Sequence, residues 1–271
     1  MATNEAFAPA KVNLALHVTG QRDDGYHLLD SLVVFADVGD RLWFEQAPAM
    51  SLEVTGPFAD GVPDDARNLV WRAAELAGQR LTIRLEKYLP HGAGIGGGSS
   101  DAAAILRAFE APEHAAKLGA DVPVCLADAP QRMQGVGERL TPVPTIPECH
   151  LVLVNPGVNM ATPAVFSALE YKENPGLGNI VNWGSQPEFV GWLQNQRNDL
   201  ETAAIGIAPV IADVLNALSD APVARMSGSG AACFGLYPDR LTAELAARRI
   251  ASENPAWWVQ CVRTAGAGRT N

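Results

Sequence analysis

The sequence predicts an α+β fold made of two layered domains. Predicted strands and helices mix along the 271 residues without the strict alternation that a single doubly wound sheet requires. A proline-rich stretch at 141–148, "TPVPTIPE", is typical of a hinge or domain boundary. A chain of this length can form two domains that each bury a core. We therefore expect an N-terminal domain over 1–146 and a C-terminal domain over 147–271.

The N-terminal part is predicted to be rich in strands. Residues 11–18, "KVNLALHV", alternate in polarity, which places Lys11 and Asn13 side by side on the less apolar face. Further expected elements are strands at 27–37, 40–46, 51–56 and 80–89, with a helix at 68–78 that ends in glycine.

A glycine-rich loop follows the last of these strands and leads into an Ala-rich helix at 101–109. We expect Ser99 or Ser100 to cap that helix. Glycines let the backbone approach an anion, and successive N–H groups at a helix N-terminus bind phosphate. Because the loop is richer in glycine and serine than a flexible turn requires, it predicts a phosphate site. The loop consists of Gly92, Ala93, Gly94, Ile95, Gly96, Gly97, Gly98, Ser99 and Ser100.

The same loop matches a dinucleotide-binding pattern, G-x-G-x-x-G, through Gly92, Gly94 and Gly97. That fold usually opens with its own strand and places an acidic residue about 20 positions later at the end of the next strand. Here several predicted strands come first, and the segment about 20 positions on, "KLGADVP", does not resemble the end of a buried strand. A dinucleotide-dependent oxidoreductase is therefore the second hypothesis.

The C-terminal part is predicted to begin with a strand at 149–154. Thr162 followed by Pro163 indicates a helix start, with threonine as N-cap, and 176–188 is expected to be loop. A final helix is expected over 241–255, followed by a strand from Trp257.

A second glycine loop lies within "RMSGSGAACF" at 225–234. Alone it would be a tight connection from a helix to a strand. Together with the first loop it predicts two backbone nests that close on one polyphosphate from different domains. The residues concerned are Ser227, Gly228, Ser229 and Gly230.

Composition restricts the partners. A formal net charge of −10 argues against a nucleic-acid partner, which would require a basic face. No apolar run reaches the roughly 18 residues of a membrane span, and the first residues do not resemble a signal peptide, so we expect a cytoplasmic protein with no membrane partner. The scattered cysteines are expected to be reduced and mostly buried, and no histidine spacing indicates a metal site. The sequence does not indicate an oligomeric state.

Taken together, the motifs resemble the GHMP superfamily of small-molecule kinases, which is named for galactokinase, homoserine, mevalonate and phosphomevalonate kinases. They occur in the family's order and cover most of the chain; only the connections near 78–81 and 110–117 look shortened. The resemblance implies a two-domain α+β fold with the active site in the cleft between the domains. The matching segments are "PAKVNLALHV" (9–18), "DGYHLLDSL" (24–32), "NLVWRAA" (68–74), "GAGIGGGSSDAA" (92–103), "LGADVPVCL" (118–126), "VNPGV" (154–158), "TPAVF" (162–166), "NDLE" (198–201) and "RMSGSGAACF" (225–234).

The resemblance implies an ATP-dependent kinase acting on a hydroxyl in the methylerythritol moiety of a small-molecule cytidylyl substrate, in the non-mevalonate isoprenoid pathway. Lys11 would neutralise charge on the transferred phosphoryl group, and Asp121 would pair with Lys11 and accept the hydroxyl proton. Without the resemblance, Asp121 followed by Val-Pro indicates the N-cap of a helix. Both roles remain open at this point.

The family pattern also assigns substrate contacts. Asn13 and His27 would form hydrogen bonds with the cytidylyl group, while Tyr26 and Phe166 would sandwich the cytosine ring. Taken singly, Tyr26 and Phe166 would more often be core residues and His27 a structural histidine.

Mg²⁺ is expected together with ATP. Ser99 or Ser100 is a candidate contact for the ion, and no acidic ligand is identified. Asn68 either caps its helix or touches adenine. Two further hypotheses remain: a GHMP kinase acting on another alcohol, such as mevalonate or homoserine, and a non-catalytic nucleotide sensor.

Overall fold

The computed structural model describes residues 3–127, 129–143 and 146–264. The chain forms two compact units that interleave along the sequence. Unit 1 comprises Met1–Lys11, Val38–His91 and Gly96–Ala127, and unit 2 comprises Val12–Asp37, Gly92–Ile95 and Asp128–Asn271. These units are defined by contacts, whereas the predicted division at residue 146 follows chain order, and that division stays a prediction.

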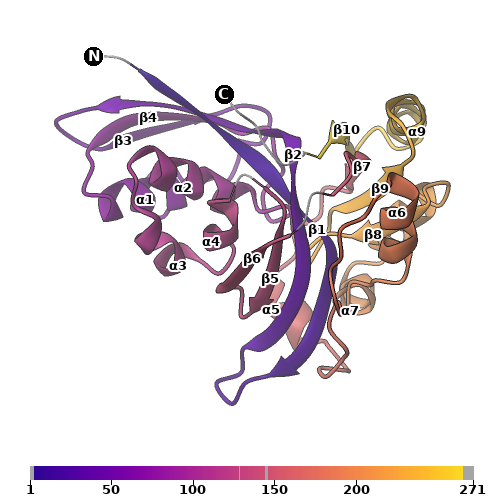
Figure 1. Cartoon of the computed structure of the whole chain (residues 1–271). Helices are drawn as coiled ribbons and strands as arrows, with labels where there is room; N and C mark the ends of the chain where they lie inside the picture. The colour runs from indigo at the N-terminus through magenta and orange to yellow at the C-terminus, as the bar shows by residue number, and fades with distance from the viewer. Residues whose placement is uncertain (1–2, 128, 144–145, 265–271) are drawn as a thin grey trace. The chain divides into compact units, whose positions relative to one another are not determined.

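Unit 1 consists of strands with helices gathered on one side of them (Figure 1). Strand β4 pairs with β2 in antiparallel fashion over Arg41–Gln46 and with β3 in parallel. The strands are β1 (Asn4–Gln21), β2 (His27–Gln46), β3 (Ser51–Thr55) and β4 (Leu81–Glu86), of which β1 and β2 continue into unit 2. The helices are α1 (Leu69–Leu76), α2 (Gly97–Ala108), η1 (Pro112–His114), α3 (Ala115–Leu118) and α4 (Val122–Cys125).

The strands predicted separately at 27–37 and 40–46 form the single strand β2. Gly39, within the supposed break, lies against the neighbouring backbone: a Cβ there would stand 2.2 Å from the carbonyl oxygen of Ala8. A glycine inside a strand can therefore mark a close approach of two backbones instead of a turn.

Unit 2 contains a four-stranded antiparallel sheet in the order β10-β7-β9-β8. Its strands are β7 (His150–Asn155), β8 (Val223–Met226), β9 (Cys233–Tyr237) and β10 (Trp258–Arg263). The first half of β2 also pairs with β5 (Gln131–Gly135), and β5 pairs with β6 (Arg139–Pro142). The helices are α5 (Thr162–Ser167), α6 (Gln186–Gln194), α7 (Glu201–Ile207), α8 (Val210–Ala217) and α9 (Arg240–Glu253).

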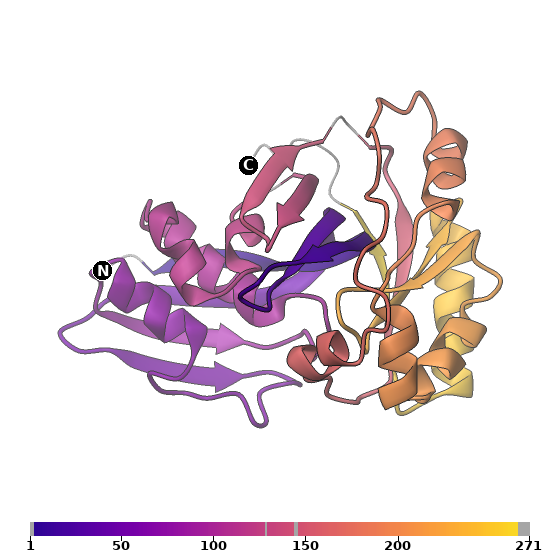
Figure 2. The ribbon, with the colours of Figure 1, turned by 90° about the horizontal axis from the view of Figure 1, so that it is seen from below.

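The core of unit 2 lies between this sheet and its helices (Figure 2). Val152 and Val154 of β7 belong to the same buried cluster as Ile211 of α8 and Ile250 of α9. Burial of such aliphatic side chains stabilises the unit by about 1.5–3 kcal/mol for each fully buried residue. The predicted strand at 149–154 and the predicted final helix and strand are confirmed within the described residues.

Three predictions of local structure were wrong. Helix α2 begins at Gly97 with Gly96 as its N-cap, so Ser99 and Ser100 lie in the first turn and do not cap it. Gly96 takes a left-handed conformation, with φ at 68°, that redirects the chain into the helix before the serines are reached. The N-cap of α5 is Ala161, so the predicted cap Thr162 is the first helical residue. The second glycine loop connects strand β8 to strand β9 and does not follow a helix.

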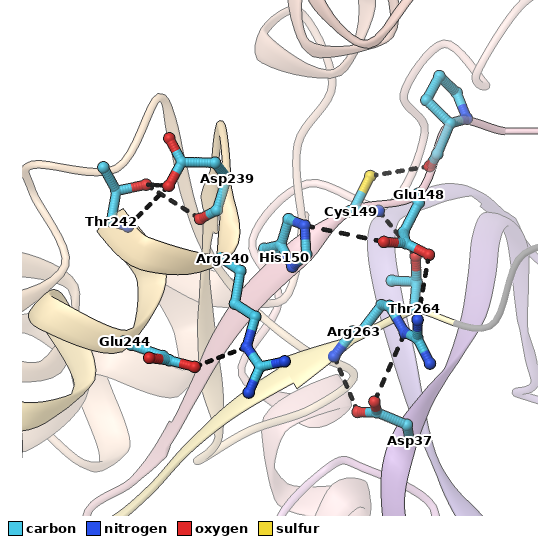
Figure 3. A network of polar contacts seen from close by, with 11 residues as sticks. Asp37, Glu148, Cys149, His150, Asp239, Arg240, Thr242, Glu244, Arg263 and Thr264 are labelled. Carbon is cyan, nitrogen blue, oxygen red and sulfur yellow. Dashed lines mark hydrogen bonds and ion pairs between the residues drawn. The ribbon is translucent and has the colours of Figure 1, made fainter.

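Polar contacts tie the end of β10 to its surroundings in unit 2 (Figure 3). The backbone N–H of Arg263 donates to Asp37 Oδ1 at 2.8 Å, and that of Cys149 donates to Thr264 Oγ1 at 3.1 Å. The Arg263 guanidinium lies 3.5 Å from Glu148 Oε2. Each exposed ion pair contributes little to the free energy of unfolding, so the role of these contacts is to hold the end of β10 in place.

The cysteines are free thiols, and all but Cys261 are buried, as expected from their spacing. In the part of the chain that the structure describes, no helix combines the length and apolar character needed to cross a membrane.

Candidate functional site

Lys11 and Asp121 form an ion pair in unit 1. Lys11 Nζ lies 2.9 Å from Asp121 Oδ2. The Lys11 side chain is 3% exposed on β1, whereas the Asp121 side chain is 39% exposed. Asp121 occupies the N-cap position of α4 but makes no side-chain capping bond there. Its carboxylate is therefore paired with the lysine, as the resemblance implied. Asp121 is the N-cap residue of α4 by position only, because its side chain does not bond to the helix backbone.

The end of the first glycine loop lies against the side chain of this lysine. A Cβ at Gly96 would stand 3.0 Å from Lys11 Cβ and 3.2 Å from Lys11 Cε. Glycine at this position thus allows the loop to reach the lysine stem. The next turn holds Ser100, whose Oγ is buried and has no hydrogen-bond partner among the described residues. An unsatisfied buried hydroxyl at a helix N-terminus is suited to an incoming anion.

The beginning of the first loop, Gly92–Ile95, belongs to unit 2 and contacts the second glycine loop there. Ser227 Oγ donates to the carbonyl oxygen of Gly94 at 3.1 Å, and the N–H of Ala232 donates to that of Ala93 at 2.9 Å. A Cβ at Gly94 would stand only 2.5 Å from the carbonyl oxygen of Ser227. The two loops, which the sequence separates by more than a hundred residues, are therefore packed backbone to backbone.

Polar side chains that the sequence reasoning did not single out hold the second loop. Asn198 Nδ2 donates to the carbonyl oxygens of Met226 and Gly228, both at 2.8 Å. Glu201 accepts the N–H of Met226 at 2.8 Å, and burial raises the pKa of Glu201. Burial also lowers the pKa of Arg225 to about 10, and its guanidinium donates to the carbonyl oxygen of Leu14. The motif "NDLE" at 198–201 contains Asn198 and Glu201, but only the folded structure shows that these side chains bind the backbone around the second glycine loop.

The residues predicted to bind the cytidylyl group lie in unit 2. His27 stacks on Phe166 with ring centroids 4.9 Å apart and an interplanar angle of 28°. His27 Nε2 is buried and has no hydrogen-bond partner among the described residues. Burial lowers the pKa of His27, and the charge of Lys172 lowers it further, which favours the neutral ring at pH 7.

Asn13 and Tyr26 differ in burial. Asn13 is 1% exposed, and its Nδ2 donates to Ser31 Oγ at 2.7 Å while its backbone N–H donates to Ser227 Oγ. Tyr26 is 64% exposed. The ring that stacks on Phe166 is that of His27, and the sandwich of cytosine between Tyr26 and Phe166 stays a prediction.

Asn68 caps helix α1. Its Oδ1 accepts the N–H of Val70 at 2.9 Å, and its Nδ2 donates to the carbonyl oxygen of Pro63 at 2.7 Å. Of the two interpretations left open, capping is the one that the contacts show.

Among the described residues, no group of three or more His, Cys, Asp or Glu side chains is arranged to hold a metal ion. His17 instead contacts the backbone on both sides, through the carbonyl oxygen of Pro175 and the N–H of Arg197.

Comparison with known proteins assigns the family. Residues 68–127 match the family described as GHMP kinases N terminal domain, and residues 172–256 match GHMP kinases C terminal. The resemblance drawn from the motifs is thereby confirmed, and the oxidoreductase hypothesis gains no support.

Curated relatives are similar along nearly the whole chain. The chain is 55% identical over 256 residues to the 4-diphosphocytidyl-2-C-methyl-D-erythritol kinase of Paracoccus denitrificans (strain Pd 1222), covering 93% of each protein. It is 55% identical over 269 residues to the kinase of the same name from Ruegeria pomeroyi, covering 94% of this chain and 96% of the relative.

Solved structures agree in fold. A crystal structure of 4-(cytidine 5'-diphospho)-2C-methyl-D-erythritol kinase matches with a TM-score of 0.77 and 34% identity, covering 97% of this chain and 100% of the other. A homoserine kinase from Cytophaga hutchinsonii matches with a TM-score of 0.72 at 16% identity, covering 98% and 95%, and shares the fold. The predicted two-domain α+β class is confirmed. The chain belongs to the 4-diphosphocytidyl-2-C-methyl-D-erythritol kinase family of the GHMP kinases.

Proposed function

We propose that this chain transfers the γ-phosphoryl group of ATP to the 2-hydroxyl of 4-diphosphocytidyl-2-C-methyl-D-erythritol. The observation that carries the proposal is the Lys11–Asp121 pair, 2.9 Å apart, with the end of the glycine loop in contact with Lys11. Phosphoryl transfer to an alcohol requires a proton acceptor and a cation near the transferred group. The pair supplies both, and curated relatives at 55% identity carry the name of this kinase.

Asp121 is proposed as the base because its side chain is accessible. A substrate hydroxyl can reach the 39% exposed carboxylate, whereas the buried Lys11 is held in a fixed position. The hydroxyl oxygen forms a bond to the γ-phosphorus while the bond to the β–γ bridging oxygen breaks, ADP departs, and the hydroxyl proton passes to Asp121. The Lys11 ammonium offsets the negative charge that gathers on the transferred group.

ATP is proposed to place its phosphates on the glycine loop. Helix α2 runs over twelve residues from Gly97, so its N-terminus carries the positive end of a helix dipole. The unpaired Ser100 Oγ offers one further donor to a phosphate oxygen. The contact of the second glycine loop with Gly92–Ile95 supports its role in holding this cradle.

Mg²⁺ is proposed to enter with the nucleotide. Among the described residues no cluster of carboxylates and imidazoles offers a dedicated metal site, which fits an ion held mainly by phosphate oxygens and water. Ser100 Oγ, an unpaired oxygen in the first turn of α2, is the side-chain ligand that fits. When bound, the ion neutralises charge on the phosphates and orients them.

The cytidylyl group is proposed to bind at His27, Phe166, Tyr26 and Asn13. The unpaired His27 Nε2 supports this assignment, because a buried ring nitrogen without a partner is costly unless a ligand satisfies it. The exposed Tyr26 is available to cover a bound base.

The test is a phosphorylation assay on the purified chain with ATP and Mg²⁺ and three separate acceptors: the cytidylyl substrate, mevalonate and homoserine. ADP release and ³¹P NMR of the product measure transfer and its position. We expect transfer only to the 2-hydroxyl of the cytidylyl compound, and faster turnover of either other alcohol would contradict the proposal. ATP with Mg²⁺, but not NAD, should protect the protein against thermal unfolding.

A further inference from the structure

Three charged side chains form a buried cluster in unit 1 that the proposed chemistry does not use. Lys87 Nζ donates to Asp40 Oδ2 and, at 2.6 Å, to Asp101 Oδ2. The three side chains are at most 3% exposed. They come from β2, from the residue after β4 and from α2. Buried charges are costly even when paired, and a buried ion pair is weak evidence for stability. The location of the cluster therefore calls for a role beyond stability.

The cluster fixes the backbone that enters the first glycine loop. Asp40 Oδ1 accepts the N–H of Tyr88 at 2.6 Å and the N–H of Leu89 at 2.9 Å. These residues directly precede the Pro90-His91 step into the loop. Both oxygens of Asp40 are thus engaged, one by the lysine and one by two backbone donors.

The cluster also fixes the backbone that leaves the loop. Asp101 lies in the second turn of α2, the helix that begins at Gly97. A Cβ at Gly97 would stand 3.4 Å from both Asp40 Oδ2 and Lys87 Nζ, so the helix start rests directly on the ion pair. The preceding residue, Gly96, lies against Lys11. Two consecutive residues therefore make the two contacts: Gly96 lies against the proposed catalytic Lys11, and Gly97 lies against the cluster.

We propose that Asp40 and Lys87 are positioning residues for nucleotide binding, which hold both ends of the glycine loop so that its N–H groups and the start of α2 meet the triphosphate beside Lys11. Asp101 accepts from Lys87 and is not part of this assignment. The side chains of Asp40 and Lys87 are buried, so the pair acts through the loop backbone. This inference rests on the proposed function, since it assigns a triphosphate to this loop.

Isosteric amide variants separate the members of the cluster. Both carboxylate oxygens of Asp40 accept hydrogen bonds, whereas an asparagine amide has only one oxygen. In Asp40→Asn the amide NH2 group therefore faces another donor, either Lys87 or the backbone N–H groups of 88–89, in both orientations of the amide. Asp101 uses only Oδ2, so Asp101→Asn keeps an oxygen for Lys87 and serves as the matched control for the same chemical change.

The primary measurement is the Kd of a fluorescent ATP analogue with Mg²⁺, without acceptor. We expect Asp40→Asn to raise this Kd about tenfold, since misplacement by about 1 Å can cost up to ~10²-fold, while Asp101→Asn stays within about twofold of wild type. In turnover assays Asp40→Asn should raise KM for ATP and leave KM for the cytidylyl substrate unchanged. Asp30→Asn breaks the ion pair between the buried Asp30 and the partly exposed Arg132 in unit 2 and should lower Tm without changing the Kd of the nucleotide.

Two results would overturn the inference: an unchanged nucleotide Kd in Asp40→Asn, or equal rises of KM for both substrates. If Asp40→Asn does not fold, Lys87→Gln replaces it, because this variant keeps one donor for Asp40 and releases Asp101; a wild-type Kd in that variant would equally overturn the inference. A wild-type chain that binds the nucleotide but does not phosphorylate the cytidylyl acceptor would refute the proposed function alone, because the Kd comparison needs no acceptor.

Discussion

Lys11 Nζ and Asp121 Oδ2 lie 2.9 Å apart although 110 residues separate them in the chain. The lysine comes from the interior of a long strand, and the aspartate from the N-cap position of a four-residue helix. The short helix α4 sets the position of the Asp121 backbone, while the ion pair sets the direction of its side chain. A carboxylate that would otherwise cap a helix is thereby presented at an accessible position.

Asp121→Asn tests the role of this carboxylate. An asparagine keeps the size of the side chain but does not accept the hydroxyl proton, and a positioned base contributes about 10²- to 10⁴-fold. We expect kcat to fall by that factor while the Kd for ATP changes little. Rapid-quench measurement of product in a single turnover, together with nucleotide titration, distinguishes the two quantities.

The control for this variant is Asp64→Asn, an exposed aspartate in unit 1 outside every proposed site. It should retain wild-type kcat. Near-normal turnover in Asp121→Asn would remove Asp121 from the mechanism.

Gly96→Ala tests the contact between the loop and Lys11. An alanine at φ 68° is strained by roughly 1–2 kcal/mol, and its methyl group would also press on Lys11 Cβ at 3.0 Å. Gly78→Ala imposes the same strain at φ 69° with no atom within 4 Å of the new methyl group. We expect both variants to lose Tm in calorimetry, Gly96→Ala at least as much as Gly78→Ala, and kcat to fall only in Gly96→Ala. Equal kcat in the two variants would show that the contact with Lys11 has no part in turnover.

Tyr26→Ala tests the proposed cytosine contact. The side chain is 64% exposed, so its removal should leave Tm nearly unchanged. We expect KM for the cytidylyl substrate to rise much more than KM for ATP, because the ring would lose its stacking with the base. Tyr171→Ala, at a tyrosine that is 76% exposed, is the control and should change neither KM. A similar effect of Tyr26→Ala on both substrates would count against stacking.

Local patterns predicted those parts of the site that depend on neighbours in sequence. The alternation at 11–18 predicted the strand that carries Lys11 and Asn13, and the glycine content predicted a backbone-lined loop before α2. The position of the helix start was missed because a left-handed glycine, which needs no side-chain cap, took the place of serine. Propensity alone does not distinguish these two ways to begin a helix.

Contacts between distant residues were beyond such patterns. The resemblance supplied the partner of Lys11, since nothing local connects residue 11 with residue 121. Lys87 follows an amphipathic strand, where a lysine is usually solvated, and its burial depends on two carboxylates from other elements. The packing of one glycine loop on the other likewise depends on backbone approach in the folded unit, which the separate loop sequences do not specify.

The buried Asp101 also predicts how stability depends on pH. Burial is the largest cause that raises its pKa, to about 8 from an ordinary 3.8, so between these values the folded chain holds a proton that the unfolded chain has lost. This contribution to stability is fully present below pH 3.8 and is lost as pH rises toward 8, with a slope of at most about 1.4 kcal/mol per pH unit. Lys87, whose pKa is raised above 10.5, stays protonated across this window and adds no slope to it. The lowered pKa of His17 and of His27 gives a slope of opposite sign below about pH 6.5, and the wild type and Asp101→Asn share this slope.

Urea unfolding of the wild type and of Asp101→Asn at pH 5, 6.5 and 8 measures this contribution. Between pH 5 and pH 8 the wild type should lose more unfolding free energy than Asp101→Asn, because asparagine does not titrate. Parallel pH profiles would mean that Asp101 is ionised throughout and that the cluster carries a net negative charge.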